Sequence, residues 1–151
     1  MPILEEKTKK ICYETFGDSD KPCLALIAGF GAQLLSWSEE LIEGLVAAGF
    51  YVVIFDNRDV GLSSYYDDLD TPIVMEAIAK LQQGQAVSSP YSLRDMADDV
   101  VTLMDGLQIA KAHIAGISMG GQIAQVFAVA HSDRTLSLTV IASGSGEPGL
   151  P

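Results

Sequence analysis

The stretch "AHIAGISMGGQIAQ", residues 112–125, decides the fold. Residues 112–117 form an apolar run that is typical of a strand buried on both faces. Ser118 follows at once, and residues 120–131 indicate a helix. A buried strand that turns directly into a helix is the unit from which parallel sheets are built. We therefore predict an α/β fold.

The rest of the chain repeats this alternation. An alternating pattern predicts a strand at residues 9–16, and continuous apolar runs predict further buried strands. These buried strands are expected at 23–28, 51–56 and 136–143, and helices at 36–49, within 72–84 and from 92 to 107. In the last of these helices one face is apolar, formed by Leu93, Met96, Val100, Leu103 and Leu107. The order predicts a mostly parallel sheet flanked by helices.

The helix at 36–49 has its own start and stop signals. Ser36 followed by Glu39 predicts a capping box at its first turn. Leu41, Leu45 and Ala48 are expected to form its apolar face. Gly49 is expected to end it.

Composition limits the function classes. With 151 residues, 48% of them hydrophobic and 19% charged, the chain can form one domain with a real core. A net charge of −11 argues against nucleic acid or an anionic membrane as the partner. We interpret this charge as a solubility trait.

The two cysteines and the first residues bear on location. Cys12 and Cys23 have no CxxC spacing and no accompanying histidine cluster, so a reducing compartment is favoured over a disulfide. Residues 1–10 lack the apolar region of a secretory signal, and no apolar run reaches the ~18 residues of a membrane span. A cytoplasmic protein that requires no metal and no organic cofactor is expected.

Ser118 is the candidate nucleophile. It occupies the centre of a G-x-S-x-G pattern with Gly116 and Gly120 on either side, between a buried strand and a helix. A sharp strand-to-helix turn needs such glycines because side chains would collide where the two elements converge. The alternative is an ordinary N-cap serine, which needs no flanking glycines.

Four segments together resemble the α/β-hydrolase family: "LIAGFGAQ" (26–33), "DNRDVGLS" (56–63), "YSLRDMADDVVTLMDGL" (91–107) and "GISMGG" (116–121). They are most similar to its esterase-like, cap-bearing branch, which includes methylesterases and cofactor-free haloperoxidase-like members. The resemblance implies a hydrolase with a serine nucleophile, and the serine at position 118 disfavours relatives that use an aspartate nucleophile.

The resemblance also implies an oxyanion hole made of backbone N–H groups. By position these belong to Phe30 and Met119. The family often has His-Gly in the first of these loops, where this chain has Ala28-Gly29. The difference removes a supporting side chain and no donor, so the two assignments stand.

A dinucleotide-binding unit is a competing interpretation of the first half. Gly29 and Gly31 would approach a pyrophosphate, and Asp56 would bind the ribose hydroxyls. Leu34 stands where close packing wants a third glycine or alanine. This interpretation also leaves Ser118 unexplained.

The charged residues that follow the strand at 51–56 admit two roles. Asp56 or Asp59 could be catalytic, or Arg58 could simply pair with a neighbouring carboxylate; we expect the second. The acidic patch at 67–70 is expected to be solvated surface, and Trp37 to be core or pocket wall.

Neither histidine can reach Ser118. His113 lies five residues earlier on the same strand, about 16 Å away at about 3.3 Å per residue. His131 follows Ser118 by thirteen residues of helix, close to 20 Å at about 1.5 Å per residue. A general base must come within about 3 Å of the hydroxyl. The base is therefore expected from outside these residues.

The family order of nucleophile, acid and histidine supports this expectation. Glu147 follows the last strand, but it lies in the turn-rich tail "GSGEPGLP" (144–151), and we expect it not to be the acid. Residues 1–151 are expected to be the N-terminal part of a hydrolase core, truncated before the cap and the last strands, with 145–151 starting the linker to the missing cap. The last strand would then expose a sheet edge.

Three explanations remain open for the lack of a base and an acid near Ser118. The chain is the N-terminal half of a longer hydrolase, a natural half that pairs with a second chain, or a non-catalytic binding protein. We favour the first. The expected function is hydrolysis of a small-molecule carboxylic ester or related acyl bond by a Ser-His-Asp mechanism, with acid and base on a complementary C-terminal fragment or a second chain.

Overall fold

The computed structural model describes residues 1–6, 9–66, 74–87 and 89–146. The predicted acidic patch at 67–70 and Glu147 lie outside the described residues. The strands are β1 (Ile3–Glu6), β2 (Lys9–Phe16), β3 (Cys23–Ile27), β4 (Tyr51–Phe55), β5 (Ala112–Ile117) and β6 (Thr135–Ile141). The helices are α1 (Glu39–Ala47), α2 (Val74–Gln82), α3 (Leu93–Gly106) and α4 (Met119–Ala130), with short 3-10 turns at Leu34–Ser36 and Ser132–Arg134.

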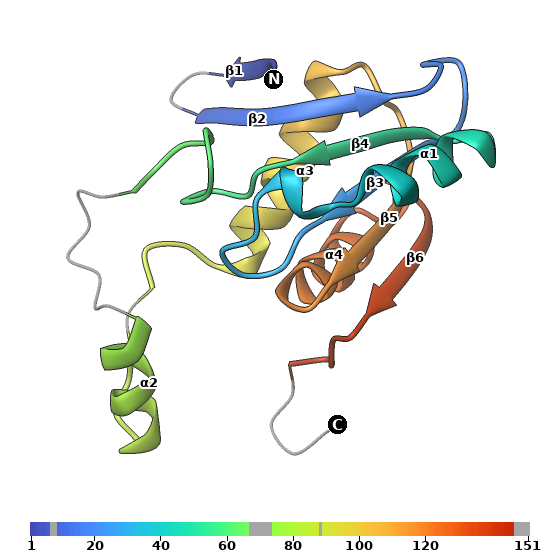
Figure 1. The fold of residues 1–151 in the computed structure, drawn as a ribbon. Helices are drawn as coiled ribbons and strands as arrows, with labels where there is room; N and C mark the ends of the chain where they lie inside the picture. Colours follow the sequence, from blue (N-terminus) through green and yellow to red (C-terminus); the bar gives the residue numbers. More distant parts are fainter. Residues whose placement is uncertain (7–8, 67–73, 88, 147–151) are drawn as a thin grey trace.

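The strands form one mixed sheet in the order β1-β2-β4-β3-β5-β6 (Figure 1). β4, β3, β5 and β6 are parallel, whereas β1 and β2 pair antiparallel at one edge. The predicted α/β class with a mostly parallel sheet is therefore confirmed. β1 was not predicted, because it is four residues long and largely exposed, and so carries little pattern.

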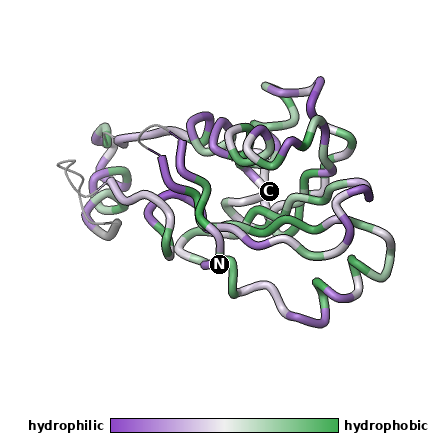
Figure 2. Tube along the Cα trace, turned by 90° about the horizontal axis from the view of Figure 1, so that it is seen from above, coloured by the Kyte–Doolittle hydropathy of each residue, from purple (hydrophilic) through white to green (hydrophobic). Residues whose placement is uncertain are grey.

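Two apolar cores lie on the two faces of the sheet. Cys23, Ala25 and Ile27 of β3 enter the core under α3 and α4, while Leu24 and Leu26 enter the core under α1. This alternation follows from the two-residue period of a strand. Viewed from above, the hydrophobic residues concentrate along the central strands (Figure 2). Both faces of β3 are covered, as its continuous apolar sequence predicts.

The start of α1 differs from the prediction. Its N-cap is Ser38, whose side chain accepts a hydrogen bond from Leu41 N, and the capping box of Ser36 with Glu39 is wrong. Residues 34–36 instead form a 3-10 turn whose first residue, Leu34, is buried. The N–H of Leu34 donates to Asp56 after β4, and this contact with a distant segment keeps the turn separate from the helix.

The apolar face of α1 also differs. Ile42 is its buried residue, Leu45 packs at the margin of the core, and Leu41 is 42% exposed. Ala48 is exposed at the C-cap, and Gly49 follows with φ 94°, as predicted for the residue that ends a helix.

The apolar face predicted for α3 is confirmed. Met96, Val100 and Leu103 are buried in the core, and Leu93 and Leu107 pack at its margin. The helix begins with a capping box in which Ser92 and Asp95 each accept from the other residue's N–H. The predicted short helix within 72–84 corresponds to α2.

β6 is a strand, as predicted, but its expected burial is wrong. Its side chains are exposed at Leu136, Leu138, Val140 and Ile141, with exposed fractions of 48%, 41%, 38% and 43%. The reason is position: β6 pairs with β5 on one side and ends the sheet order. The exposed apolar edge that we expected is present, and such an edge favours pairing with further chain.

Three smaller expectations can be compared with the structure. Cys12 and Cys23 are free thiols, both buried, and burial raises the pKa of Cys23 to about 12. Trp37 packs against the core under α1. Within the described ranges, the helices are too short or too polar for any of them to cross a bilayer.

Candidate active site

The candidate site lies where the chain reverses its direction of travel across the sheet. From β3 the chain passes to β4 on one side and later returns to β5 on the other side of β3. Ile27 and Gly116, at the carboxyl ends of β3 and β5, are register partners. In open α/β sheets, ligands bind in the crevice outside such strand ends.

Ser118 adopts a strained backbone conformation at this point. Its φ is 55° and its ψ is −125°, between the last residue of β5 and the first of α4. Ser118 holds the N-cap position, but its side chain makes no capping hydrogen bond. An ordinary N-cap has extended φ and ψ and a capping side chain. The N-cap alternative is therefore wrong, and the exposed hydroxyl is left available for other chemistry.

The flanking glycines are required by close backbone contacts. A Cβ on Gly116 would collide with the carbonyl of Gly120, and a Cβ on Gly120 would collide with the carbonyls of Ile27 and Ala28. α4 thus begins directly against the ends of β3 and β5. The steric reason given for these two glycines is confirmed by their surroundings.

The loop after β3 lies beside Ser118. A Cβ built on Gly29 would stand 3.3 Å from Ser118 Cβ and 3.8 Å from Ser118 Oγ. The chain then turns, with Ala32 N donating to Gly29 O at 3.2 Å and Gly31 at φ 68°. Phe30 follows Gly29 in this turn, and Met119 directly follows Ser118 as the first residue of α4. Their role as oxyanion donors stays a prediction.

Asp56 and Asn57, directly after β4, contact that loop. Asp56 Oδ1 accepts from Leu34 N at 2.7 Å, and Asp56 Oδ2 accepts from Leu62 N at 3.1 Å. Asn57 Nδ2 donates to Ala28 O at 3.1 Å. The sequence analysis did not predict these hydrogen bonds to the loop after β3, because the bonded residues are far apart in the chain.

The dinucleotide interpretation is wrong on the same observation. Asp56 is 3% exposed, and both its carboxylate oxygens already accept backbone N–H groups. It has no exposed face with which to bind ribose hydroxyls.

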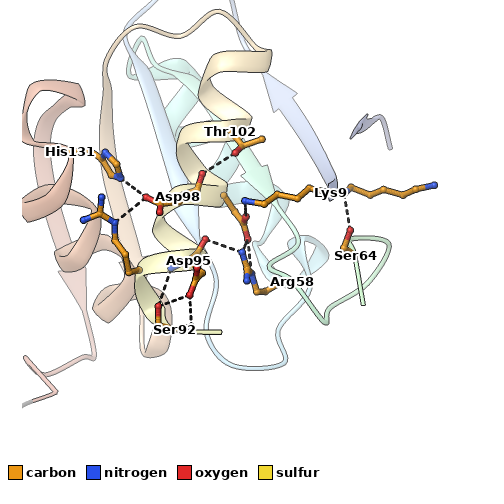
Figure 3. A network of polar contacts seen from close by, with 11 residues as sticks. Lys9, Arg58, Ser64, Ser92, Asp95, Asp98, Thr102 and His131 are labelled. Atoms are coloured by element: carbon orange, nitrogen blue, oxygen red, sulfur yellow. Dashed lines mark hydrogen bonds and ion pairs between the residues drawn. The ribbon is translucent and has the colours of Figure 1, made fainter. Parts of the chain in front are cut away.

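Arg58 is paired with a carboxylate, as predicted. It contacts Asp99 of α3 at 2.7 Å, and Lys9 reaches the other oxygen of Asp99 at 2.9 Å (Figure 3). The guanidinium also lies over the rings of Tyr66 and Tyr91. These contacts fasten the loop after β4 to α3. Asp59 accepts from the Tyr91 hydroxyl at 2.6 Å, and burial together with this hydrogen bond raises the pKa of Tyr91.

Both histidines have partners away from Ser118. His113 Nδ1 lies 2.7 Å from Ser137 Oγ on β6, and its ring packs edge-on against Phe50. His131 Nε2 lies 2.8 Å from Asp98 Oδ1 on α3 (Figure 3). The expectation that neither imidazole serves Ser118 agrees with these contacts.

Residues 22–150 match the model of the alpha/beta hydrolase fold family. The chain belongs to this family. That assignment agrees with the strand order, the strained turn at Ser118 and the glycines around it.

Several relatives are hydrolases. The chain is 35% identical over 132 residues to Rhodomycin D methylesterase of Streptomyces peucetius, covering 87% of this chain and 38% of the relative. It is 28% identical over 137 residues to 3-oxoadipate enol-lactonase 2 of Acinetobacter baylyi, covering 91% of this chain and 42% of the relative. Among solved structures, a hydrolase from Pseudomonas aeruginosa is similar with a TM-score of 0.76 and 26% identity, covering 98% of this chain and 48% of that one. The chain thus spans less than half the length of these proteins.

Proposed function

We propose that this chain is the nucleophile-bearing part of a serine hydrolase that cleaves a carboxylic ester or a related acyl bond. The observation that carries the proposal is Ser118, held at φ 55° in a sharp turn with its hydroxyl uncommitted to capping. Ser118 is exposed and lies beside the loop after β3. The methylesterase and enol-lactonase among the relatives support this reaction class.

The reaction is acyl transfer through a covalent intermediate. Ser118 Oγ attacks the carbonyl carbon while its proton passes to an imidazole supplied from outside these 151 residues. The negative charge on the carbonyl oxygen is held by the N–H groups of Phe30 and Met119. The leaving alcohol takes the proton from the imidazole. Water then gives a proton to the imidazole as it attacks the acyl carbon, and Ser118 Oγ leaves with that proton while the carboxylic acid is released.

A segment beyond these residues, or a second chain, supplies the base and the acid that orients it. This part of the proposal is supported by the contacts of the two imidazoles with Ser137 and Asp98. It is also supported by relatives of which this chain covers 38% and 42%. The substrate is a small ester-like molecule.

A fluorophosphonate probe tests the proposal in the assembly that carries the acid and base. The probe should label the assembly, and Ser118→Ala should abolish labelling because the phosphonyl group bonds to that hydroxyl. Ser137→Ala is the matched control, since Ser137 contacts an imidazole but lies on β6. Labelling that survives Ser118→Ala, or that is lost in Ser137→Ala, would assign the nucleophile elsewhere. An assembly that is never labelled would favour a non-catalytic binding protein.

A further inference from the structure

We infer that Asp56 and Asn57 are positioning residues that hold the oxyanion loop, residues 28–34, at the distance from Ser118 that acyl transfer requires. The inference rests on the proposed function. Neither side chain touches the reacting atoms, so neither is a catalytic residue. Their effect is on the location of the Phe30 N–H.

The two side chains fasten the loop at its two ends. Asn57 Nδ2 donates to Ala28 O, two residues before Phe30. Asp56 Oδ1 accepts from Leu34 N, four residues after Phe30. Between these anchors the chain makes the turn closed by Ala32 N and Gly29 O. Because both ends are fixed to the carboxyl end of β4, the position of the Phe30 N–H depends on this one dipeptide.

The dipeptide is itself held rigidly. Asp56 and Asn57 are 3% and 4% exposed. Asp56 N donates to Cys12 O at 2.9 Å, so its backbone is fastened to β2. A Cβ on Gly61 would collide with the Asp56 carboxylate, so the loop after β4 closes tightly over it. Rigid support is what a preorganised donor needs, since a misplacement of about 1 Å can cost about a hundredfold in rate.

Contact with α4 also restricts the position of the loop. Ala28 O, the acceptor of Asn57, also lies against Gly120 in the first turn of α4. Movement of Ala28 would therefore alter the contact between the loop and the helix that begins at Ser118. Asn57 therefore fixes a carbonyl that also lies against the first turn of α4.

Asn57→Ala and Ser64→Ala form the first pair of variants, made in the complete hydrolase. Ser64 is half-buried in the loop after β4, where its hydroxyl accepts from Lys10 N rather than contacting Asp56, Asn57 or residues 28–34. We expect Asn57→Ala to lower kcat about tenfold to a hundredfold with little change in KM. Affinity for a trifluoromethyl ketone, whose adduct uses the oxyanion hole, should fall in parallel. Ser64→Ala should leave kcat and inhibitor affinity near wild type.

Asp56→Asn and Asp99→Asn form the second pair. Both aspartates are buried, and each carboxylate accepts from two groups. Asp56 accepts from Leu34 N and Leu62 N, whereas Asp99 accepts from Lys9 and Arg58 and not from residues 28–34. Asp56→Asn should lower kcat, whereas Asp99→Asn should act on the thermal midpoint alone. If Asn57→Ala and Asp56→Asn keep wild-type kcat and inhibitor affinity, the positioning inference is overturned.

Amide hydrogen exchange separates this inference from the proposed function. Exchange in residues 28–34 should rise in Asn57→Ala and stay unchanged in Ser64→Ala, whether or not the protein hydrolyses esters. Unchanged exchange in Asn57→Ala would overturn the inference by itself. If exchange is faster in Asn57→Ala but no fluorophosphonate labels the wild-type protein, the proposed function is overturned. The loop anchors would still be established.

Discussion

Ser118 combines an exposed hydroxyl with a backbone conformation that serine rarely adopts. A residue held in a sparsely populated region costs about 1–3 kcal/mol, which the surrounding structure must offset. Ser118 N donates to Ile141 O at 3.0 Å, and Ser118 O accepts from Gly121 N at 2.9 Å. These bonds tie the turn to β6 and to α4, so the hydroxyl is presented at a fixed point rather than on a mobile loop.

A pair of glycine substitutions tests the close packing around this turn. Gly120→Ala places a methyl group against the carbonyls of Ile27 and Ala28, whereas a Cβ on Gly44 in α1 meets no atom within 4 Å. We expect Gly120→Ala to lower the free energy of unfolding by about 1–3 kcal/mol. Gly44→Ala should raise it by about 0.5–1 kcal/mol, because alanine loses less entropy in a helix. Urea titration measures both, and equal effects would contradict the predicted collision.

At the scale of elements, the N-termini of α1 and α3 show two ways to begin a helix. Ser38 caps α1 by accepting from Leu41 N alone. Ser92 caps α3 and is in turn bound by Asp95, whose carboxylate accepts from Ser92 N at 2.8 Å and from Ser92 Oγ at 2.6 Å. These hydrogen bonds from Ser92, the side-chain one foremost, lower the pKa of Asp95.

The two caps should therefore differ in their dependence on pH. A carboxyl with a lowered pKa in the folded state stabilises the protein above its unfolded pKa of about 3.9, and this stability is lost as pH falls through the folded pKa. Ser92→Ala should cost about 1 kcal/mol at pH 7, with a smaller cost in acid as Asp95 is protonated. Ser38→Ala should cost about the same at pH 7, with a cost that changes less over that range. Denaturant unfolding of both variants, measured at pH values from 7 downward, tests this difference. Stability losses that depend on pH in the same way for the two variants would refute it.

At the scale of the whole molecule, the described residues bring Ser118 and its neighbouring loops together but leave one edge of the sheet open. β6 exposes apolar side chains at the edge of the sheet, next to the carbonyl that holds Ser118 N. The partners of His113 and His131 lie on β6 and α3. Under our proposal, the reaction requires a base that the described residues do not place at the turn.

The 151 residues alone should therefore show little or no turnover of an activated ester such as p-nitrophenyl acetate. A serine hydroxyl without a base is a weak nucleophile at neutral pH. His113→Ala and His131→Ala should not change the residual rate. Strong activity that either substitution removes would show that an imidazole of this chain reaches Ser118 after all.

Several features could be predicted from sequence because their signals are local. The apolar runs of β3, β4 and β5 indicated buried strands, and the spacing of Met96, Val100 and Leu103 indicated the buried face of α3. Ser118 could be found because a strand, a serine between glycines and a helix are consecutive in the chain. The pairing of Arg58 with a carboxylate was expected, but not that the partner would be Asp99, 41 residues away.

Other features depended on contacts that no local pattern encodes. The N-cap of α1 is Ser38 and not the predicted Ser36, which lies in the 3-10 turn whose first residue, Leu34, donates to Asp56. β6 is exposed although its sequence is apolar. β1 carries too few residues for a pattern. In each case the deciding partner lies elsewhere in the chain or, for β6, does not lie among the described residues.

The sequence by itself determined the α/β class, and it predicted the candidate nucleophile Ser118 and the separation of both histidines from it. These follow from residue types and from the fixed rise per residue of strands and helices. Only the tertiary structure decided which strands are neighbours, which apolar strand is left exposed, and that Asp56 and Asn57 hold the loop beside Ser118. Hydrogen bonds between distant segments form only after the sheet has brought those segments together, so periodicity along the chain carries no record of them.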